Sequence, residues 1–72
     1  MTTSLLPYQQ RVVDEHAELD SRLYRLTAFC DSAVYEQLSI VDRELLQAQL
    51  RLMTELCSVL TSRIERFSVS AT

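Results

Sequence analysis

Few side chains in this 72-residue chain could do chemistry, and its single histidine is the first to consider. His16 and Cys57 both fall at core positions of helical repeats, and an antiparallel pairing of those repeats would bring them close together. A metal site that includes Glu55 is conceivable, but no fourth ligand follows at a recognised zinc spacing. A polar residue in a heptad core more often fixes the helix register, which is the interpretation we favour. We therefore expect no metal and no cofactor.

The two cysteines are not expected to form a disulfide. If the helices pair around a turn at residues 31–38, Cys30 lies near residue 40 and Cys57 near residue 13. The two thiols are then ~25 Å apart along the hairpin, whereas a disulfide needs Cα atoms within ~7 Å. We expect both cysteines to be small, reduced core residues.

Polar groups that could hold an anionic ligand line one flank of the first half of the chain. At helical spacing this flank contains Tyr8, Arg11, Glu15, Glu18, Arg22 and Arg25. Arginine binds phosphate through paired hydrogen bonds, and a tyrosine ring can stack on a base. Where several copies of the chain meet, these arginines could converge on one ligand. The alternative is an ordinary solvated helix surface with ion pairs such as Glu18–Arg22.

No catalytic grouping is visible in the sequence. There is no Ser/His/Asp or Cys/His arrangement beyond the expected proximity of His16 and Cys57. A chain without glycine cannot form a glycine-rich phosphate loop. Neighbouring carboxylates such as Asp14 and Glu18 fit a solvated helix face. We therefore expect a binding protein and not an enzyme.

Composition indicates a folded helical chain. It is 47% hydrophobic and 24% charged, which is too apolar for a disordered segment. Acidic residues outnumber basic ones by 10 to 7, which argues against binding DNA or RNA. An all-β chain would need glycine in its turns, and there is none. No stretch approaches the ~20 apolar residues of a membrane span, and the start lacks a signal-peptide pattern, so we expect a cytoplasmic location without membrane contact.

The elements that must position these residues are two helices in one domain, which we expect to span residues 1–72. The first helix is expected over about residues 5–30. Ser4 is a suitable N-cap for it, since serine accepts a hydrogen bond from a free amide of the first turn. Pro7 suits that first turn because its missing N–H costs nothing there.

A turn is expected over residues 31–38, followed by the second helix over about residues 39–67. This helix opens with Ser39 and has an acid, Asp42, three positions later, which is close to a capping box. The tail over residues 68–72 is small and polar, and we expect it to fray.

Heptad-spaced apolar positions predict how the helices pack. The first helix carries one seam, formed by Val12, His16, Leu19, Leu23, Leu26 and Cys30. The second helix carries a seam formed by Leu46, Leu50, Met53, Cys57, Leu60, Ile64 and Phe67, and beside it a second stripe of Leu45, Leu52, Leu56 and Val59. One partner helix covers a face about 100° wide, so the second stripe should stay exposed. We therefore predict an all-α, two-helix antiparallel hairpin that assembles into a helical-bundle oligomer through its second helix.

Both helices also resemble a known group of proteins. The resemblance rests on YQQRVVDE at residues 8–15, ELD at 18–20, RL at 22–23, LL at 45–46, QL at 49–50, VL at 59–60 and RI at 63–64. Over about residues 8–67 the chain resembles small phage and prophage helical-hairpin proteins related to the hairpin domain of anti-CBASS and anti-Thoeris cyclic nucleotide sponge proteins.

The resemblance implies an oligomer of hairpins, hexameric in the best-known relatives, that acts in the host cytoplasm. Such proteins sequester a cyclic nucleotide messenger without catalysis, because tight binding lowers its free concentration. By position, Tyr8 would stack on a base, and Arg22 and Arg25 would contact phosphates. Arg11 is the family's opening arginine, and Glu15 lies on the same flank.

Two other interpretations remain open. The chain could be an inhibitor or adaptor that docks its apolar helix face on a host protein, which predicts a monomer or dimer with spare hydrophobic surface. It could also be a structural assembly factor that binds neither a nucleotide nor a host protein.

Overall fold

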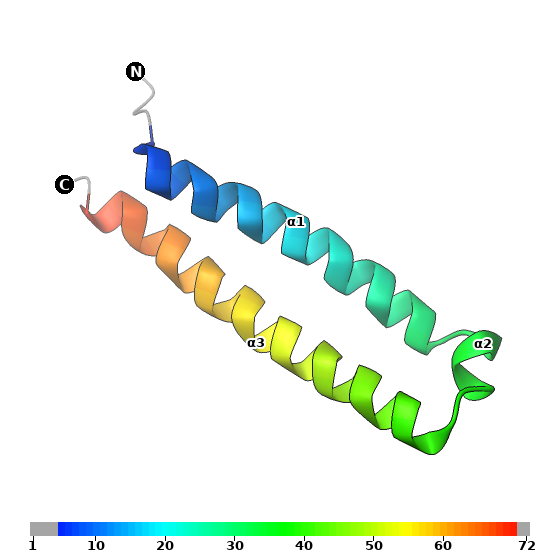
Figure 1. The fold of residues 1–72 in the computed structure, drawn as a ribbon. Coiled ribbons are helices and arrows are strands. Elements are labelled where there is room, and N and C mark those ends of the chain that lie inside the picture. Colours follow the sequence, from blue (N-terminus) through cyan, green and yellow to red (C-terminus); the bar gives the residue numbers. More distant parts are fainter. Residues whose placement is uncertain (1–4, 71–72) are drawn as a thin grey trace.

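Two long antiparallel helices dominate the computed structural model, which describes residues 5–70 and the side chains of residues 5–67. Helix α1 spans Pro7–Cys30 and helix α3 spans Ile40–Ser70, and a short helix α2, Ala33–Glu36, joins them. Figure 1 shows α2 at one end of the hairpin, and the start of α1 and the end of α3 at the other. The predicted all-α hairpin is confirmed, and the described residues contain no strand.

Helix α1 begins at Pro7, two residues later than the sequence suggested. The N-cap position belongs to Leu6, whose N–H donates to the Oε1 atom of Gln9 at 2.9 Å. Proline at the first helical position explains this start, because its missing N–H costs nothing there, as expected for Pro7. The predicted cap, Ser4, lies outside the described residues.

The connection at residues 31–38 is more ordered than the expected turn, because it contains α2. The Oγ atom of Ser32 accepts a hydrogen bond from the N–H of Tyr35 at 3.3 Å and donates to the carbonyl of Phe29 at 2.6 Å. No residue of the described chain has a positive φ angle. A chain without glycine thus reverses direction through a short helical turn, which needs only negative φ angles.

Helix α3 begins at Ile40 after the expected cap, since the Oγ atom of Ser39 accepts a hydrogen bond from the N–H of Asp42 at 3.1 Å. The helix runs to Ser70, three residues beyond the predicted end. No glycine or proline interrupts the chain over residues 68–70, which is why the helical geometry continues past the approximate end predicted at residue 67. Residues 71–72 of the predicted tail lie outside the described residues.

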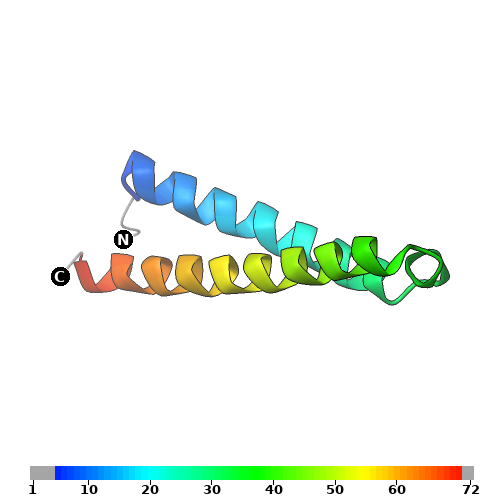
Figure 2. The same ribbon diagram turned by 60° about the horizontal axis from the view of Figure 1, so that its bottom comes forward.

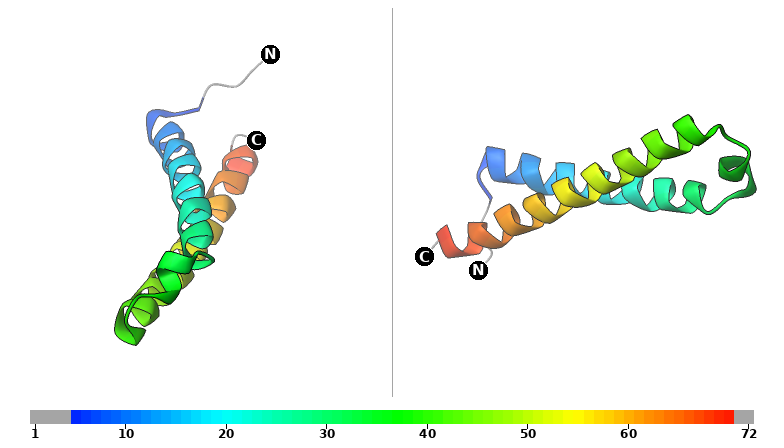
Figure 3. Two further views of the ribbon diagram at one scale, coloured as in Figure 1. Left: turned by 90° about the vertical axis from the view of Figure 1, so that its right-hand side faces the viewer. Right: turned by 90° about the horizontal axis from the view of Figure 1, so that it is seen from below.

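The contact between α1 and α3 follows the two predicted seams. Val12 and Leu60 are buried, with exposed fractions of 6% and 2%, and the other seam residues are half-buried. Figures 2 and 3 show that the helices cross at a shallow angle. The core of a single hairpin is therefore one thin layer between two helices.

The register differs from the simple pairing expected around the turn. The expected proximity of His16 and Cys57 is confirmed, because the Sγ atom of Cys57 lies 3.5 Å from the Nε2 atom of His16, three positions beyond residue 13 in the simple pairing. At the open end the rings of Tyr8 and Phe67 meet edge to face, with centroids 6.1 Å apart. Side chains lean toward the N-terminus of their own helix, so contacting residues of antiparallel helices lie further from the turn in α3 than simple pairing predicts.

The hairpin exposes more surface than a compact chain of its mass. It measures 52 × 17 × 15 Å, and its radius of gyration is 16.2 Å, against about 11 Å for a compact domain of this length. Its accessible surface is 5695 Å², whereas a compact protein of 8.3 kDa exposes about 4,600 Å². None of the helices in the described residues is long and apolar enough to cross a membrane.

Candidate functional site

The predicted ligand residues all lie on the exposed surface of α1, at Tyr8, Arg11, Glu15, Arg22 and Arg25. We call this set, together with Glu18, the α1 flank. At about 1.5 Å of rise per residue, Tyr8 and Arg25 are ~26 Å apart along the helix axis. One hairpin therefore does not bring the whole flank to a single ligand. It presents an open-end group around Tyr8 and a second group at Arg22 and Arg25.

At the open end, Tyr8 is held but still accessible. Its ring packs on Phe67 at an interplanar angle of 83°, and 49% of its surface remains exposed. An edge-to-face contact fixes the ring while leaving part of it free to stack. Arg11 lies one turn further along α1 and is exposed. The structure thus allows the stacking role that the sequence suggested for Tyr8.

Nearer the turn, the expected ion pair between Glu18 and Arg22 is present. Both side chains are largely exposed, at 63% and 60%. An exposed ion pair of this kind contributes about 0–1 kcal/mol, so it holds Arg22 only weakly. A phosphate could replace the carboxylate of Glu18 at little cost.

A row of exposed apolar side chains runs along α3. It consists of Val41, Leu45, Leu52, Leu56 and Val59, whose exposed fractions lie between 47% and 64%. We call this set the α3 row. Four of its members form the second stripe that the sequence predicted to stay uncovered, and that prediction is confirmed.

The α1 flank and the α3 row lie on the same side of the hairpin. Successive residues of a helix are turned by about 100° around its axis. At this angle Tyr8 lies at the edge of the α1 seam that borders the α1 flank. Phe67 likewise lies at the edge of the α3 seam that borders the α3 row. The contact between these two rings joins those edges. His16 and Thr61 lie at the opposite edges of their seams, and they also contact each other. One face of the molecule therefore combines arginines with exposed leucines.

The histidine forms polar contacts inside the seam. Its Nε2 atom lies 2.9 Å from the Oγ1 atom of Thr61, and that hydroxyl donates to the carbonyl of Cys57 at 2.9 Å. With that proton used there, the hydroxyl of Thr61 accepts a hydrogen bond from His16 in the tautomer that carries the proton on Nε2. The described residues contain no group of three His, Cys, Asp or Glu side chains able to hold a metal ion. Sequence reasoning placed His16 beside Cys57 but missed Thr61.

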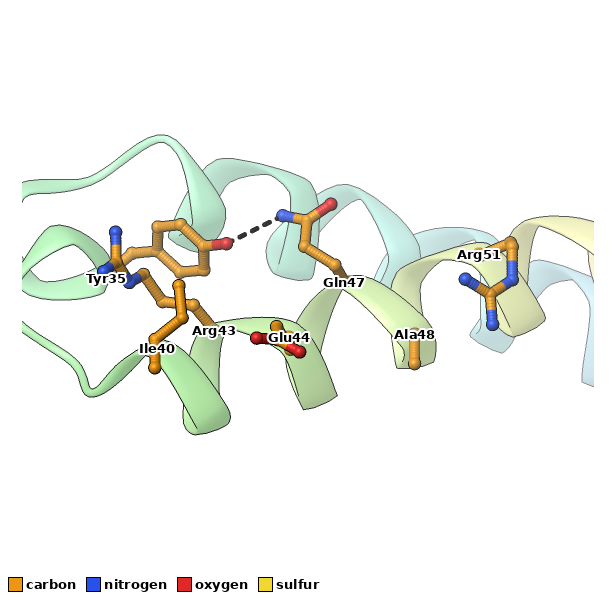
Figure 4. A pocket seen from close by; sticks show the side chains of 7 residues that line it. All are labelled: Tyr35, Ile40, Arg43, Glu44, Gln47, Ala48 and Arg51. Carbon is orange, nitrogen blue, oxygen red and sulfur yellow. Dashed lines mark hydrogen bonds between the residues drawn. The ribbon is translucent and has the colours of Figure 1, made fainter.

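A groove near the turn was also missed. It has a volume of about 460 Å³ and is lined by Tyr35, Ile40, Arg43, Glu44, Gln47, Ala48 and Arg51 (Figure 4). The hydroxyl of Tyr35 accepts a hydrogen bond from Nε2 of Gln47 at 3.0 Å. The spacing of Arg43, Gln47 and Arg51, four residues apart, was the available signal for one wall of the groove.

Comparison with known proteins identifies the family. The family model described as Sequestin matches residues 6–66, which include almost all of both long helices. A similar protein occurs in Enterobacteria phage T4, described as an uncharacterized 7.5 kDa protein in the denB-rIIB intergenic region. It is 35% identical over 63 residues, which cover 88% of this chain and 98% of the phage protein. No solved structure matches the chain. The match along both helices and their connection shows that the chain belongs to the Sequestin family.

Proposed function

We propose that this protein is a phage-encoded sponge for a cyclic nucleotide signal of host immunity. In this proposal several hairpins assemble in the host cytoplasm, bind the signal between chains and lower its free concentration without catalysis. Membership of a family named Sequestin, with a relative in a phage, supports a sequestering role. The observation that carries the proposal is the face on which the α1 flank and the α3 row lie together.

Assembly and binding are linked on that face. Mutual burial of the α3 row would remove exposed leucines from water, which favours association. The α1 flank lies beside the row, so the same contact carries its arginines to the boundary between chains. In a two-fold pair with antiparallel hairpins, the open end of one chain meets the turn end of the other. Such a pair still leaves Arg22 and Arg25 near the middle of each hairpin, ~20 Å or more from the partner's Tyr8, so the proposed site requires further copies, which a higher oligomer would supply.

Each residue type has a role in this arrangement. Arg22 and Arg25 would bind phosphates through charge-assisted hydrogen bonds, with Arg22 released from its weak pair with Glu18. Tyr8 would stack on a base, supported from behind by Phe67. Glu15 would accept hydrogen bonds from a sugar or base, and Arg11 would add positive charge at the open end.

Calorimetric titration with cyclic mono-, di- and trinucleotides tests the proposal. We expect at least one of them to bind, and the double variant Arg22→Glu/Arg25→Glu to lose that binding while its far-UV circular dichroism stays helical. Ser58→Glu is the control, because it adds a charge at an exposed position of α3 outside both the row and the flank. Absence of binding by every nucleotide to the folded wild-type protein would contradict the proposal.

The α3 row also supports a second candidate function, the docking of this face on a host protein. In that case the arginines would be solvated surface residues, and the charge reversals on α1 would leave the activity unchanged. A hairpin that stays monomeric and binds no cyclic nucleotide would favour this candidate.

A further inference from the structure

We propose that the groove at the turn is a second ligand site, specific for a nucleotide that carries two phosphate groups. The site is formed by α2 and the first three turns of α3, and it shares no residue with the α1 flank. It therefore does not depend on the proposed sponge function.

The groove carries positive charge in an acidic protein. Its lining includes two arginines, Arg43 and Arg51, and one carboxylate, Glu44, whereas the whole chain has a net charge of −3. Within the described part of the chain neither arginine has a carboxylate at ion-pair distance. Both guanidinium groups are thus available to an anion from solution.

Arg43 lines the groove and carries an unsatisfied donor. Its Nε atom is buried, and no acceptor among the described residues hydrogen-bonds to it. A buried donor without an acceptor is unfavourable, and a phosphate oxygen is the strongest acceptor for a guanidinium. The enclosed Nε atom has no surface for a ligand to contact, so an anion in the groove would bind the terminal nitrogens of Arg43.

The spacing along α3 indicates two anionic groups. Arg43 and Arg51 are eight positions apart, or ~12 Å along the helix axis. This separation is too large for both arginines to form paired hydrogen bonds with one phosphate. Figure 4 shows Gln47 between them, with its amide directed to the hydroxyl of Tyr35. A ligand with two separated phosphates could contact one arginine with each.

The part of the lining between the charges suits a base and a sugar. Ile40 and Ala48 contribute apolar surface, and Tyr35 contributes a half-buried ring fixed edge to face against Phe29, with centroids 6.4 Å apart. Gln47 still has a free amide oxygen, because its hydrogen bond to Tyr35 uses only the nitrogen. A volume of about 460 Å³ lies in the range of small-molecule sites.

Titration of the full chain with adenosine 3′,5′-bisphosphate tests this proposal, with AMP as the matched single-phosphate ligand. We expect the bisphosphate to bind at least about tenfold more tightly than AMP. Binding should also shift the side-chain N–H signals of Arg43 and Gln47 in a nitrogen–proton NMR spectrum. Equal affinity for both ligands, or no binding, would overturn the proposal.

Variants of the lining separate this groove from other sites. Arg51→Gln and Arg43→Gln should each weaken bisphosphate binding about tenfold, and Glu44→Gln should strengthen it by removing the repelling carboxylate. Arg66→Gln, an exposed arginine of α3 outside the groove, is the charge-matched control. If Arg43→Gln fails to fold, the affinity of Arg51→Gln for the bisphosphate still tests the proposal, because Arg51 is exposed. Equal losses in Arg66→Gln, or losses only in Arg22→Gln and Arg25→Gln, would refute the groove without touching the sponge proposal.

Discussion

At the scale of single residues, the thin core makes each seam position matter. Val12 and Leu60 are the apolar side chains that the hairpin buries best, and no large side chain in the described residues is completely enclosed. The polar cluster of His16, Cys57 and Thr61 occupies part of the same seam. Because a chain of this size is marginally stable, a single truncation in the seam should be measurable.

Leu60→Ala should lower the free energy of unfolding by about 2 kcal/mol or more, since it removes buried methyl groups and leaves a cavity. Thermal and chemical unfolding followed by circular dichroism would measure the loss. Tyr24→Ala is the control, because that side chain is 78% exposed and its truncation should change stability by about 0.5 kcal/mol at most. Similar losses for both variants would mean that Leu60 is not a core residue.

At the scale of elements, local signals set the helix boundaries. The Ser39 cap and the proline at the start of α1 fix where each long helix begins. The short helix α2 is held by Ser32, whose hydroxyl accepts a hydrogen bond from the N–H of Tyr35 within α2 and donates one to the carbonyl of Phe29 in α1. The groove of Arg43 depends on this arrangement, because α2 supplies Tyr35.

Removing the cap of α3 gives a prediction at this scale. Ser39→Ala should reduce stability by about 1 kcal/mol, because the N–H of Asp42 loses its acceptor. Ser58→Ala makes the same chemical change at an exposed position inside α3, where alanine is the better helix former, so it should be neutral or slightly stabilising. The two melting temperatures, compared by circular dichroism, decide the matter. Equal values would contradict the capping role.

At the scale of the whole molecule, the hairpin exposes more surface to solvent than a compact protein of the same mass. The excess lies on an elongated body with an uncovered row of leucines and valines along α3. Association of several copies would bury this row and convert two thin seams into a thicker core. The two functional proposals differ at this scale, because the sponge requires neighbouring chains and the groove requires only one.

Charged side chains in the α3 row should prevent assembly. We expect the wild-type protein to be oligomeric at tens of micromolar, and Leu52→Glu/Leu56→Glu to be a helical monomer, since two carboxylates would be buried at the contact. Light scattering after size-exclusion chromatography gives the molar mass. Ser58→Glu/Ser62→Glu adds the same charges at exposed positions outside the row and should remain oligomeric. A monomeric wild-type protein would refute the assembly argument.

The sequence by itself determined which residues lie on which side of each helix. Heptad spacing identified both seams, the exposed row and the exposed flank, because a helix turns by a fixed angle per residue and side-chain direction follows from position alone. Ser39 was recognisable as a cap for the same local reason. The exposure of Tyr8, Arg22 and Arg25 was predictable from the same spacing, whereas the gathering of these residues that the sponge proposal requires was not, since in that proposal it depends on other chains.

Only the tertiary structure decided which residues of different helices meet. The pairing of His16 with Thr61, the shared side of the flank and the row, and the groove that joins Tyr35 to Arg43 depend on the shape of the connection and on the crossing of the helices. These contacts arise from packing across the whole hairpin, and the spacing of residues within one helix does not specify them. A short helical connection in a chain without glycine set them here.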